Sequence, residues 1–304
     1  MLAGGLLLGL LLAPLSRAEM FNAPECRPFT LNEQQPQGFG KFSRGLLWEI
    51  KRDGVAPSHL FGTIHISDPA VLALPELVTD ALDNSSTYVM ELLPEPDQMM
   101  TISGMMFFPD EKRLNHFVSQ PVFSRTVEIL ADYQLNAQAI AVMKPWAAMM
   151  TMSYPPQSGT ILDLDLLQRA QGNGARIIGL EKLREQLDIF NDLELSDQVS
   201  ILIDTVCHYD LVTAGFTKMK ELYLQRDLNG LYLYNQRFAV PDDELYDMLM
   251  DRLLTRRNYI MVERLEPVLQ RGNAFIAIGA LHLTGEEGVL SLLQKKQYRI
   301  KLIY

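Results

Sequence analysis

Short apolar runs alternate with segments of helical periodicity along most of this 304-residue chain. The runs SHLFGTIHI (58–66), TYVMELL (87–93) and ARIIGLE (175–181) are each long enough for one strand, and amphipathic stretches lie between them. Alternation of buried strands with helices is typical of α/β domains, in which helices cover a sheet. We therefore predict an α/β fold with a mixed sheet, flanking helices and a helical insertion.

The two ends of the domain add further elements. GLLWEIKRDG (45–54) alternates apolar and polar residues and ends in Asp-Gly, so it predicts a hairpin with 58–66. Near the C-terminus, NAFIAIGALHL (273–283) and YRIKLIY (298–304) are further strand candidates. The predicted helices are 74–86, LDLDLLQRAQGNG (162–174), one that starts with KLREQLDIF (182–190), 196–226, 242–271 and 285–297.

The N-terminal region reads as an export signal. Residues 1–18 hold an apolar core followed by Ser16-Arg17-Ala18, a pattern typical of a cleaved signal peptide. The apolar run is shorter than the roughly 20 residues that cross a bilayer, although an uncleaved anchor is the alternative. We expect an irregular extension at 19–44, an α/β domain at 45–304 and a helical insertion at about 95–157. The predicted location is periplasmic or secreted, with no integral membrane span after cleavage.

Charge and motifs exclude several classes of function. Asp and Glu outnumber Lys and Arg by 37 to 27, so the phosphate backbone of a nucleic acid is an unfavourable partner. The sequence contains no nucleophile elbow of serine hydrolases, Walker loop, dinucleotide fingerprint or His-Glu-x-x-His helix. These absences argue against serine-based hydrolysis, ATP use and dinucleotide binding.

Two residue types leave alternatives open. Cys26 and Cys207 are the only cysteines, and after export they could form one disulfide or remain as two separate thiols. Residues 95–157 hold many of the 15 methionines, which fill a core or line an adaptable apolar groove. Their loose spacing argues against a copper site.

Two similar motifs carry the strongest functional signal. GTIH (62–65) and GALH (279–282) each follow an apolar run and place glycine three residues before histidine. Ligands of α/β folds bind beyond the strand ends, so His65 and His282 are predicted to converge from different strands. His59, His116 and His208 lack this context, and we expect them to be structural or surface residues.

Glu91 is the third candidate, because it stands where the apolar run 87–93 ends. A buried carboxylate is costly unless a cation or hydrogen bonds compensate its charge. Two histidines and one carboxylate form a common catalytic set of metal ligands that leaves a position open for water. Alternatively, each histidine is a hydrogen-bonded core or rim residue and Glu91 faces water.

The sequence motifs of this chain resemble those of the TraB/GumN family, which is related to the pheromone-shutdown proteins and to the Tiki proteases. The resemblance runs from about residue 45 to the end, through FGTIH, YVMEL, ILDLDLLQRAQ, IIGLEKLREQL, RRNYIM and AIGALHLTGEEGVLSLLQKKQYRI. It implies an erythromycin-esterase-like α/β fold with pseudo-symmetric halves, and a metal-dependent peptidase whose active centre contains His65, Glu91 and His282.

Three further positions match the family signature, and the resemblance gives them supporting roles: Glu181, Arg257 and Asn258. Arg257 could stabilise an oxyanion, although an arginine on a helix is more often an ion-pair partner on the surface. Asp163 follows the central glycine of the family pattern, but three residues separate it from Gly159. That departure counts against Asp163 as a site residue.

We predict an exported metal-dependent hydrolase, a peptidase that acts on a peptide or protein. His65 and His282 bind a divalent ion (zinc, manganese or cobalt), and Glu91 completes the ligand set or acts as general base. One alternative is a non-catalytic protein of the same fold that binds metal, haem or peptide. Another is a scaffold without a site.

Overall fold

The computed structural model describes residues 23–26, 41–93, 104–154, 156, 159–236 and 244–304. Its centre is a six-stranded mixed sheet with the order β4-β3-β5-β2-β1-β6. The strands are β1 (Leu47–Lys51), β2 (Ser58–Thr63), β3 (Thr87–Leu92), β4 (Arg176–Glu181), β5 (Ala274–Gly279) and β6 (Arg299–Leu302). The predicted mixed α/β fold is therefore confirmed, whereas pseudo-symmetry of its halves stays a prediction.

The pairing of the strands brings both Gly-x-x-His motifs to one edge. β2 and β5 are direct parallel neighbours, with Thr63 opposite Gly279, and β3 runs parallel to both β5 and β4. β1 pairs antiparallel with β2, which confirms the predicted hairpin, and also with β6. Since parallel strands share one carboxyl edge, the residues after β2, β3 and β5 lie together.

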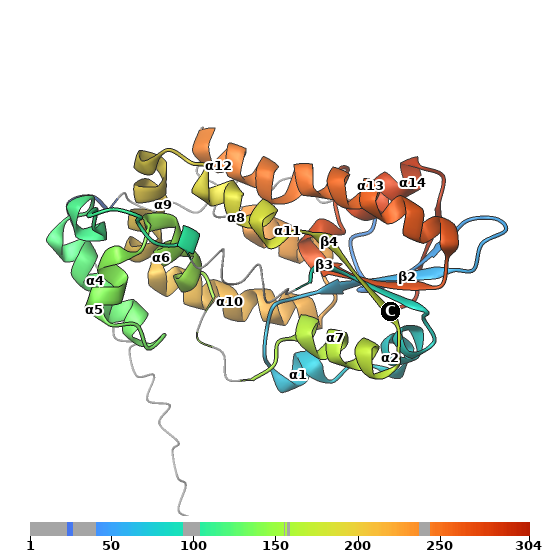
Figure 1. Cartoon of the computed structure of the whole chain (residues 1–304). Helices are drawn as coiled ribbons and strands as arrows, with labels where there is room; N and C mark the ends of the chain where they lie inside the picture. Colours follow the sequence, from blue (N-terminus) through green and yellow to red (C-terminus); the bar gives the residue numbers. More distant parts are fainter. Residues whose placement is uncertain (1–22, 27–40, 94–103, 155, 157–158, 237–243) are drawn as a thin grey trace, which may run out of the picture.

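Helices cover both faces of the sheet (Figure 1). On one face lie α1 (Pro69–Leu72), α2 (Glu76–Asp83) and α7 (Leu162–Gly172), and on the other lie α13 (Arg256–Arg271) and α14 (Val289–Lys295). The remaining elements near the site are α10 (Tyr209–Leu224), α11 (Leu228–Gln236), α12 (Glu244–Met250), the π-helical turn η2 (Asp251–Thr255) and the 3-10 turn η3 (Ala280–His282).

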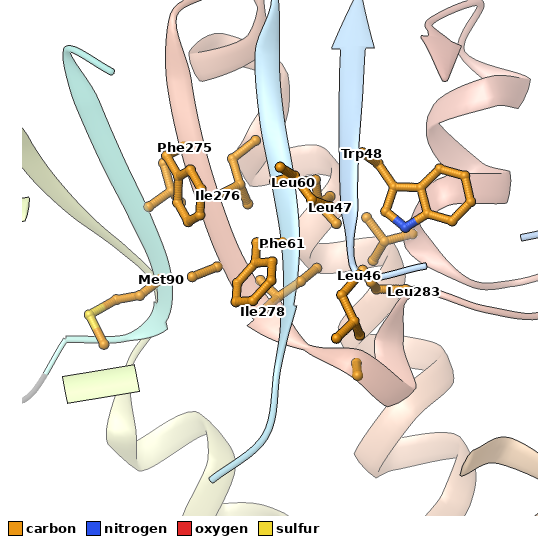
Figure 2. Packing of buried hydrophobic residues seen from close by; sticks show 14 of the residues in the cluster. Leu46, Leu47, Trp48, Leu60, Phe61, Met90, Phe275, Ile276, Ile278 and Leu283 are labelled. Carbon is orange, nitrogen blue, oxygen red and sulfur yellow. The ribbon is translucent and has the colours of Figure 1, made fainter. Parts of the chain in front are cut away.

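The main core fills the space between the sheet and these helices. Leu60 and Phe61 of β2 pack beside Phe275 and Ile276 of β5, and all four are at most 1% exposed (Figure 2). β5 is buried along nearly its whole length, as expected for a central parallel strand. Each such side chain contributes about 1.5–3 kcal/mol through burial, so the core holds the two motif-bearing strands rigidly in register.

A second hydrophobic core forms a helical lobe beside the sheet. Its elements are η1 (Leu114–His116), α4 (Gln120–Ala131), α5 (Ala137–Val142), α6 (Pro145–Met152), α8 (Leu183–Asn191) and α9 (Leu195–Cys207). Met143, Met149 and Met152 are buried in this core, so these methionines fill a core. Side chains of α8 and α9 complete the lobe, so it draws on residues outside 95–157. The limits of the insertion stay a prediction.

The predicted helix at 196–226 is wrong as a single helix. It divides at His208 into α9 and α10, which are bent by 77°. The ring of His208 hydrogen-bonds the carbonyl of Asp204, and the backbone at His208 leaves the helical region (φ −118°, ψ 25°). Among the described residues no single helix could span a membrane by length and hydropathy, and only this bent pair passes that test jointly.

A disulfide joins Cys26 to Cys207 across 181 residues of sequence, with 5.6 Å between the Cα atoms. Of the two alternatives for the cysteines, the structure therefore shows the bonded one. The bond fastens the short described segment 23–26 to the end of α9. The predicted signal at 1–18 lies outside the described residues.

Removing both cysteines (C26S/C207S) should lower the free energy of unfolding by about 2–5 kcal/mol, because the bond restricts a long loop of the unfolded chain. Urea denaturation under oxidising conditions measures the difference. Adding reductant should bring the unmodified protein to the stability of the variant. Equal stability without reductant would contradict the expectation.

Candidate functional site

A cavity of about 780 Å³ opens at the carboxyl edge of the parallel strands. His65, Glu91, Arg257 and His282 all line it, so the structure brings the predicted site residues of three strands and one helix to a single space. Of the supporting residues, Asn258 and Glu181 contact members of this group from outside the cavity lining.

Both histidines lie beyond their strands, not within them as the predicted strand limits 58–66 and 273–283 implied. β2 ends at Thr63, and the chain at η3 packs closely against it: a Cβ on Gly62 would lie 2.7 Å from Leu283 Cδ1 and 3.3 Å from the Cα of Ala280. Gly62 therefore allows the close approach that places His282 beside the end of β2.

His65 is held by Asp163, from the first turn of α7. Its Nδ1 lies 2.8 Å from Asp163 Oδ2, and the hydroxyl of Thr63 donates to Asp163 Oδ1 at 2.7 Å. Asp163, whose separation from Gly159 counted against it, therefore contacts a candidate site residue, although it does not line the cavity. Although burial opposes it, the hydrogen bond and charge of Asp163, together with Glu91, raise the pKa of His65 to about 9.

His282 is buried and is oriented by Asn258. Asn258 Nδ2 donates to the carbonyl of Glu287 at 2.9 Å, so its Oδ1 faces His282 and accepts from Nδ1–H at 2.6 Å. This pairing leaves the lone pair on Nε2, which lies 3.8 Å from Glu91 Oε1. Burial lowers the pKa of His282 to about 4, so the ring is neutral at pH 7.

Glu91 is only 8% exposed at the end of β3. Its Oε1 accepts the backbone N–H of Gly279, and its Oε2 accepts from the guanidinium of Arg257 at 2.8 Å. A Cβ on Gly279 would lie 3.1 Å from Oε1, so the second motif glycine also makes room for the carboxylate. Although burial opposes it, the charges of Arg257 and of protonated His65, together with the Gly279 N–H, hold the pKa of Glu91 below its usual range.

Arg257 lies between two buried glutamates. Besides Glu91, its guanidinium donates to Glu181 at 2.7 and 2.9 Å, and Nη1 donates to the carbonyl of Leu253 at 3.1 Å. The side chain is 14% exposed. Arg257 is thus neither a surface ion-pair partner nor an unengaged oxyanion donor, because two carboxylates share its charge.

The donor chemistry of the two histidines fits a divalent cation. In metal sites a ligating imidazole commonly hydrogen-bonds an oxygen through its other nitrogen, and both His65 and His282 do so through Nδ1. In the part of the chain that the structure describes, no three His, Cys, Asp or Glu residues are yet grouped closely enough to hold an ion. Binding therefore requires local side-chain movement and loss of a proton from His65.

Two of the residues that line the cavity were not predicted as site residues from the sequence. His208 was expected to be structural or on the surface, but it lines the cavity at the bend between α9 and α10. Tyr154 also lines it, with its ring edge-on to His65 at 6.2 Å between centroids. Neither residue has a sequence signal, since each is placed by the packing of the helical lobe.

In metal-free protein, D163N should lower the pKa of His65 from about 9 toward the ordinary 6.5, because the hydrogen bond to a carboxylate and the charge of Asp163 are lost. NMR titration of the ring measures this value. With the raised pKa, the stability gained from the pair is fully present below about pH 6.5 and is lost as the pH rises through about 9. An unchanged pKa near 9 in the variant would show that another group holds the proton.

Replacing Arg257 by Met should destabilise the fold by about 3–5 kcal/mol, because Glu91 and Glu181 would remain buried without their cation. Arg256 is the matched control. It is the preceding residue on the same helix, its side chain is 65% exposed, and R256M should cost about 1 kcal/mol or less. Equal losses for both variants in urea denaturation would refute the proposed compensation.

The sequence of this chain is similar to those of several known proteins. The chain is 24% identical to Metalloprotease TIKI1 of Xenopus tropicalis, covering 94% of this chain and 66% of that protein. It is 26% identical to Metalloprotease TIKI2 of Danio rerio (86% and 61%) and 24% identical to the uncharacterized protein YbaP of Shigella flexneri (81% and 91%). The chain thus spans slightly less than two thirds of the two metalloproteases.

None of the solved structures gives a significant match. A family model described as the TraB/PrgY/gumN family matches residues 46–302, which include every residue of the site above. The match covers both Gly-x-x-His motifs, the strand that carries Glu91 and the helix that carries Arg257. This chain belongs to the TraB/PrgY/gumN family.

Proposed function

We propose that this protein is an exported metal-dependent hydrolase that cleaves peptide bonds. The observation that carries the proposal is the convergence of His65, Glu91 and His282 on one cavity from three neighbouring parallel strands. The names of the metalloprotease relatives support the reaction class. The Cys26–Cys207 disulfide supports export, because such bonds persist in oxidising compartments.

His65 and His282 would hold the ion, with Glu91 as the third ligand. A divalent ion there would supply Lewis acidity and lower the pKa of bound water to about 7. Zinc, manganese and cobalt all accept such ligands. Glu91 fits the ligand role better than that of general base, because a carboxylate whose pKa is held below its usual range accepts protons weakly near neutral pH.

The remaining residues prepare the site. Asn258 fixes the tautomer of His282, and Asp163 orients the ring of His65. Arg257 keeps Glu91 ionised despite its burial. The buried surroundings strengthen each of these electrostatic interactions.

The test is cleavage of a peptide library by the full chain, followed by mass spectrometry. Chelator should abolish cleavage and one of Zn²⁺, Mn²⁺ or Co²⁺ should restore it. H65A, H282A and E91Q should reduce cleavage to background, and N258L should weaken metal affinity by about 10–100-fold through loss of orientation. H116A, at an exposed histidine outside the cavity lining, is the control and should remain fully active.

Two results would contradict the proposal. Cleavage that survives chelation and both histidine substitutions would place the activity elsewhere. Bound metal without cleavage of any peptide, unchanged in E91Q, would indicate a binding protein of the same fold.

A further inference from the structure

We propose that the apolar part of the cavity binds a bulky apolar side chain of the substrate peptide, next to the bond that is cleaved. This inference rests on the proposed function and names its substrate class: peptides with a large aliphatic or aromatic residue at the scissile bond. The polar end of the cavity holds the candidate catalytic group. Most of the remaining lining comes from α10, α11, α12 and η2.

One wall of this apolar chamber is formed by α12 and η2. Leu245, Leu249 and Leu253 follow one another at intervals of four residues, which places them along one helical face. All three line the cavity, and none of the residues of α12 or η2 is fully buried. A row of leucines that faces a cavity and remains half-buried is unusual for a helix that serves only to pack a core.

A second wall is formed by α10. Val212, Phe216 and Met219 are spaced four and three residues apart, so they also share a helical face, and all three line the cavity. They too are only half-buried. Gly215, beside Phe216, lines the cavity without a side chain and so widens it.

The chamber is continuous with the candidate catalytic group. The ring of Phe216 meets Tyr154 edge-on at 6.3 Å between centroids, and Tyr154 meets His65 at 6.2 Å. A ligand side chain against Phe216 therefore lies one aromatic ring away from His65. This proximity selects a peptide as occupant, because its backbone would reach the polar end while its side chain fills the apolar one.

The size and chemistry of the cavity agree with this assignment. Its volume of about 780 Å³ lies within the roughly 300–1,000 Å³ common for ligand pockets, which are mostly apolar with a few placed polar groups. Apolar surface of this kind gains by leaving water when a ligand covers it. A small or polar side chain of the substrate would leave the leucine and phenylalanine side chains of the walls exposed to water.

Binding is measured first without cleavage. Fluorescently labelled pentapeptides Ala-Ala-X-Ala-Ala, with X as Phe, Leu, Ser or Gly, are titrated with the full chain in chelator, and anisotropy gives the Kd. We expect Phe and Leu peptides to bind at least about tenfold more tightly than the Ser peptide, since pockets discriminate apolar groups by about 10–200-fold. With metal restored, cleavage should follow the same order.

Pairs of variants test which residues cause the preference for Phe and Leu peptides. L249Q and F216S should reduce the ratio of the Kd of the Ser peptide to that of the Phe or Leu peptide to less than about threefold. M248Q, next to Leu249 but outside the cavity lining, and L224S, on α10 and 41% exposed, should leave it intact. Circular dichroism melting confirms that each variant is folded, and any variant that fails to fold is replaced by L253Q or V212N on the same walls.

The outcomes separate this inference from the proposed function. Cleavage with equal Kd values for all four peptides, or a preference that persists in L249Q and F216S, would overturn the apolar subsite and leave the hydrolase standing. A clear apolar preference without cleavage under any metal would support the subsite and overturn the hydrolase. Tight binding of oleate or haem with no binding of any peptide would overturn the peptide assignment.

Discussion

The burial of Glu91 at the end of β3 is the constraint on which the site depends. A carboxylate that is only 8% exposed requires compensation, and the fold supplies it from three directions: the Gly279 N–H of β5, the guanidinium of Arg257 and the protonated ring of His65. Each contact links a different element to the carboxylate of Glu91. Arg257 also donates to Glu181, so Glu91, Arg257 and Glu181 form one network rather than separate ion pairs.

The glycines explain how these elements approach so closely. Gly62 leaves space for the chain at Ala280, and Gly279 leaves space for Glu91, so each motif glycine makes room for a segment that carries another residue of the site. The parallel pairing of β2 with β5 then places both histidines at one edge. Burial keeps His282 neutral, whereas Asp163 charges His65, and two similar motifs thereby acquire different proton affinities.

Much of this arrangement follows from local sequence. Apolar runs and Asp-Gly turns predicted the strands and the hairpin, and the repeated Gly-x-x-His context singled out His65 and His282, because these signals depend on neighbouring residues. The bend at His208 and the pairing of Asp163 with His65 did not follow, since both depend on contacts between distant segments. The sequence suggested a metal as the compensating cation of Glu91 and did not identify Arg257, an arginine 166 residues away that also compensates this charge.

The central claim, that His65 and His282 share one cation, is tested most directly by anomalous diffraction. Crystals soaked in Zn²⁺, Mn²⁺ or Co²⁺ would be measured at the absorption edge of the metal. We expect one anomalous peak within about 2.0–2.2 Å of a ring nitrogen of each histidine, with a Glu91 oxygen at a similar distance. A peak bound to only one histidine, or no peak at this edge of the sheet, would contradict the shared site.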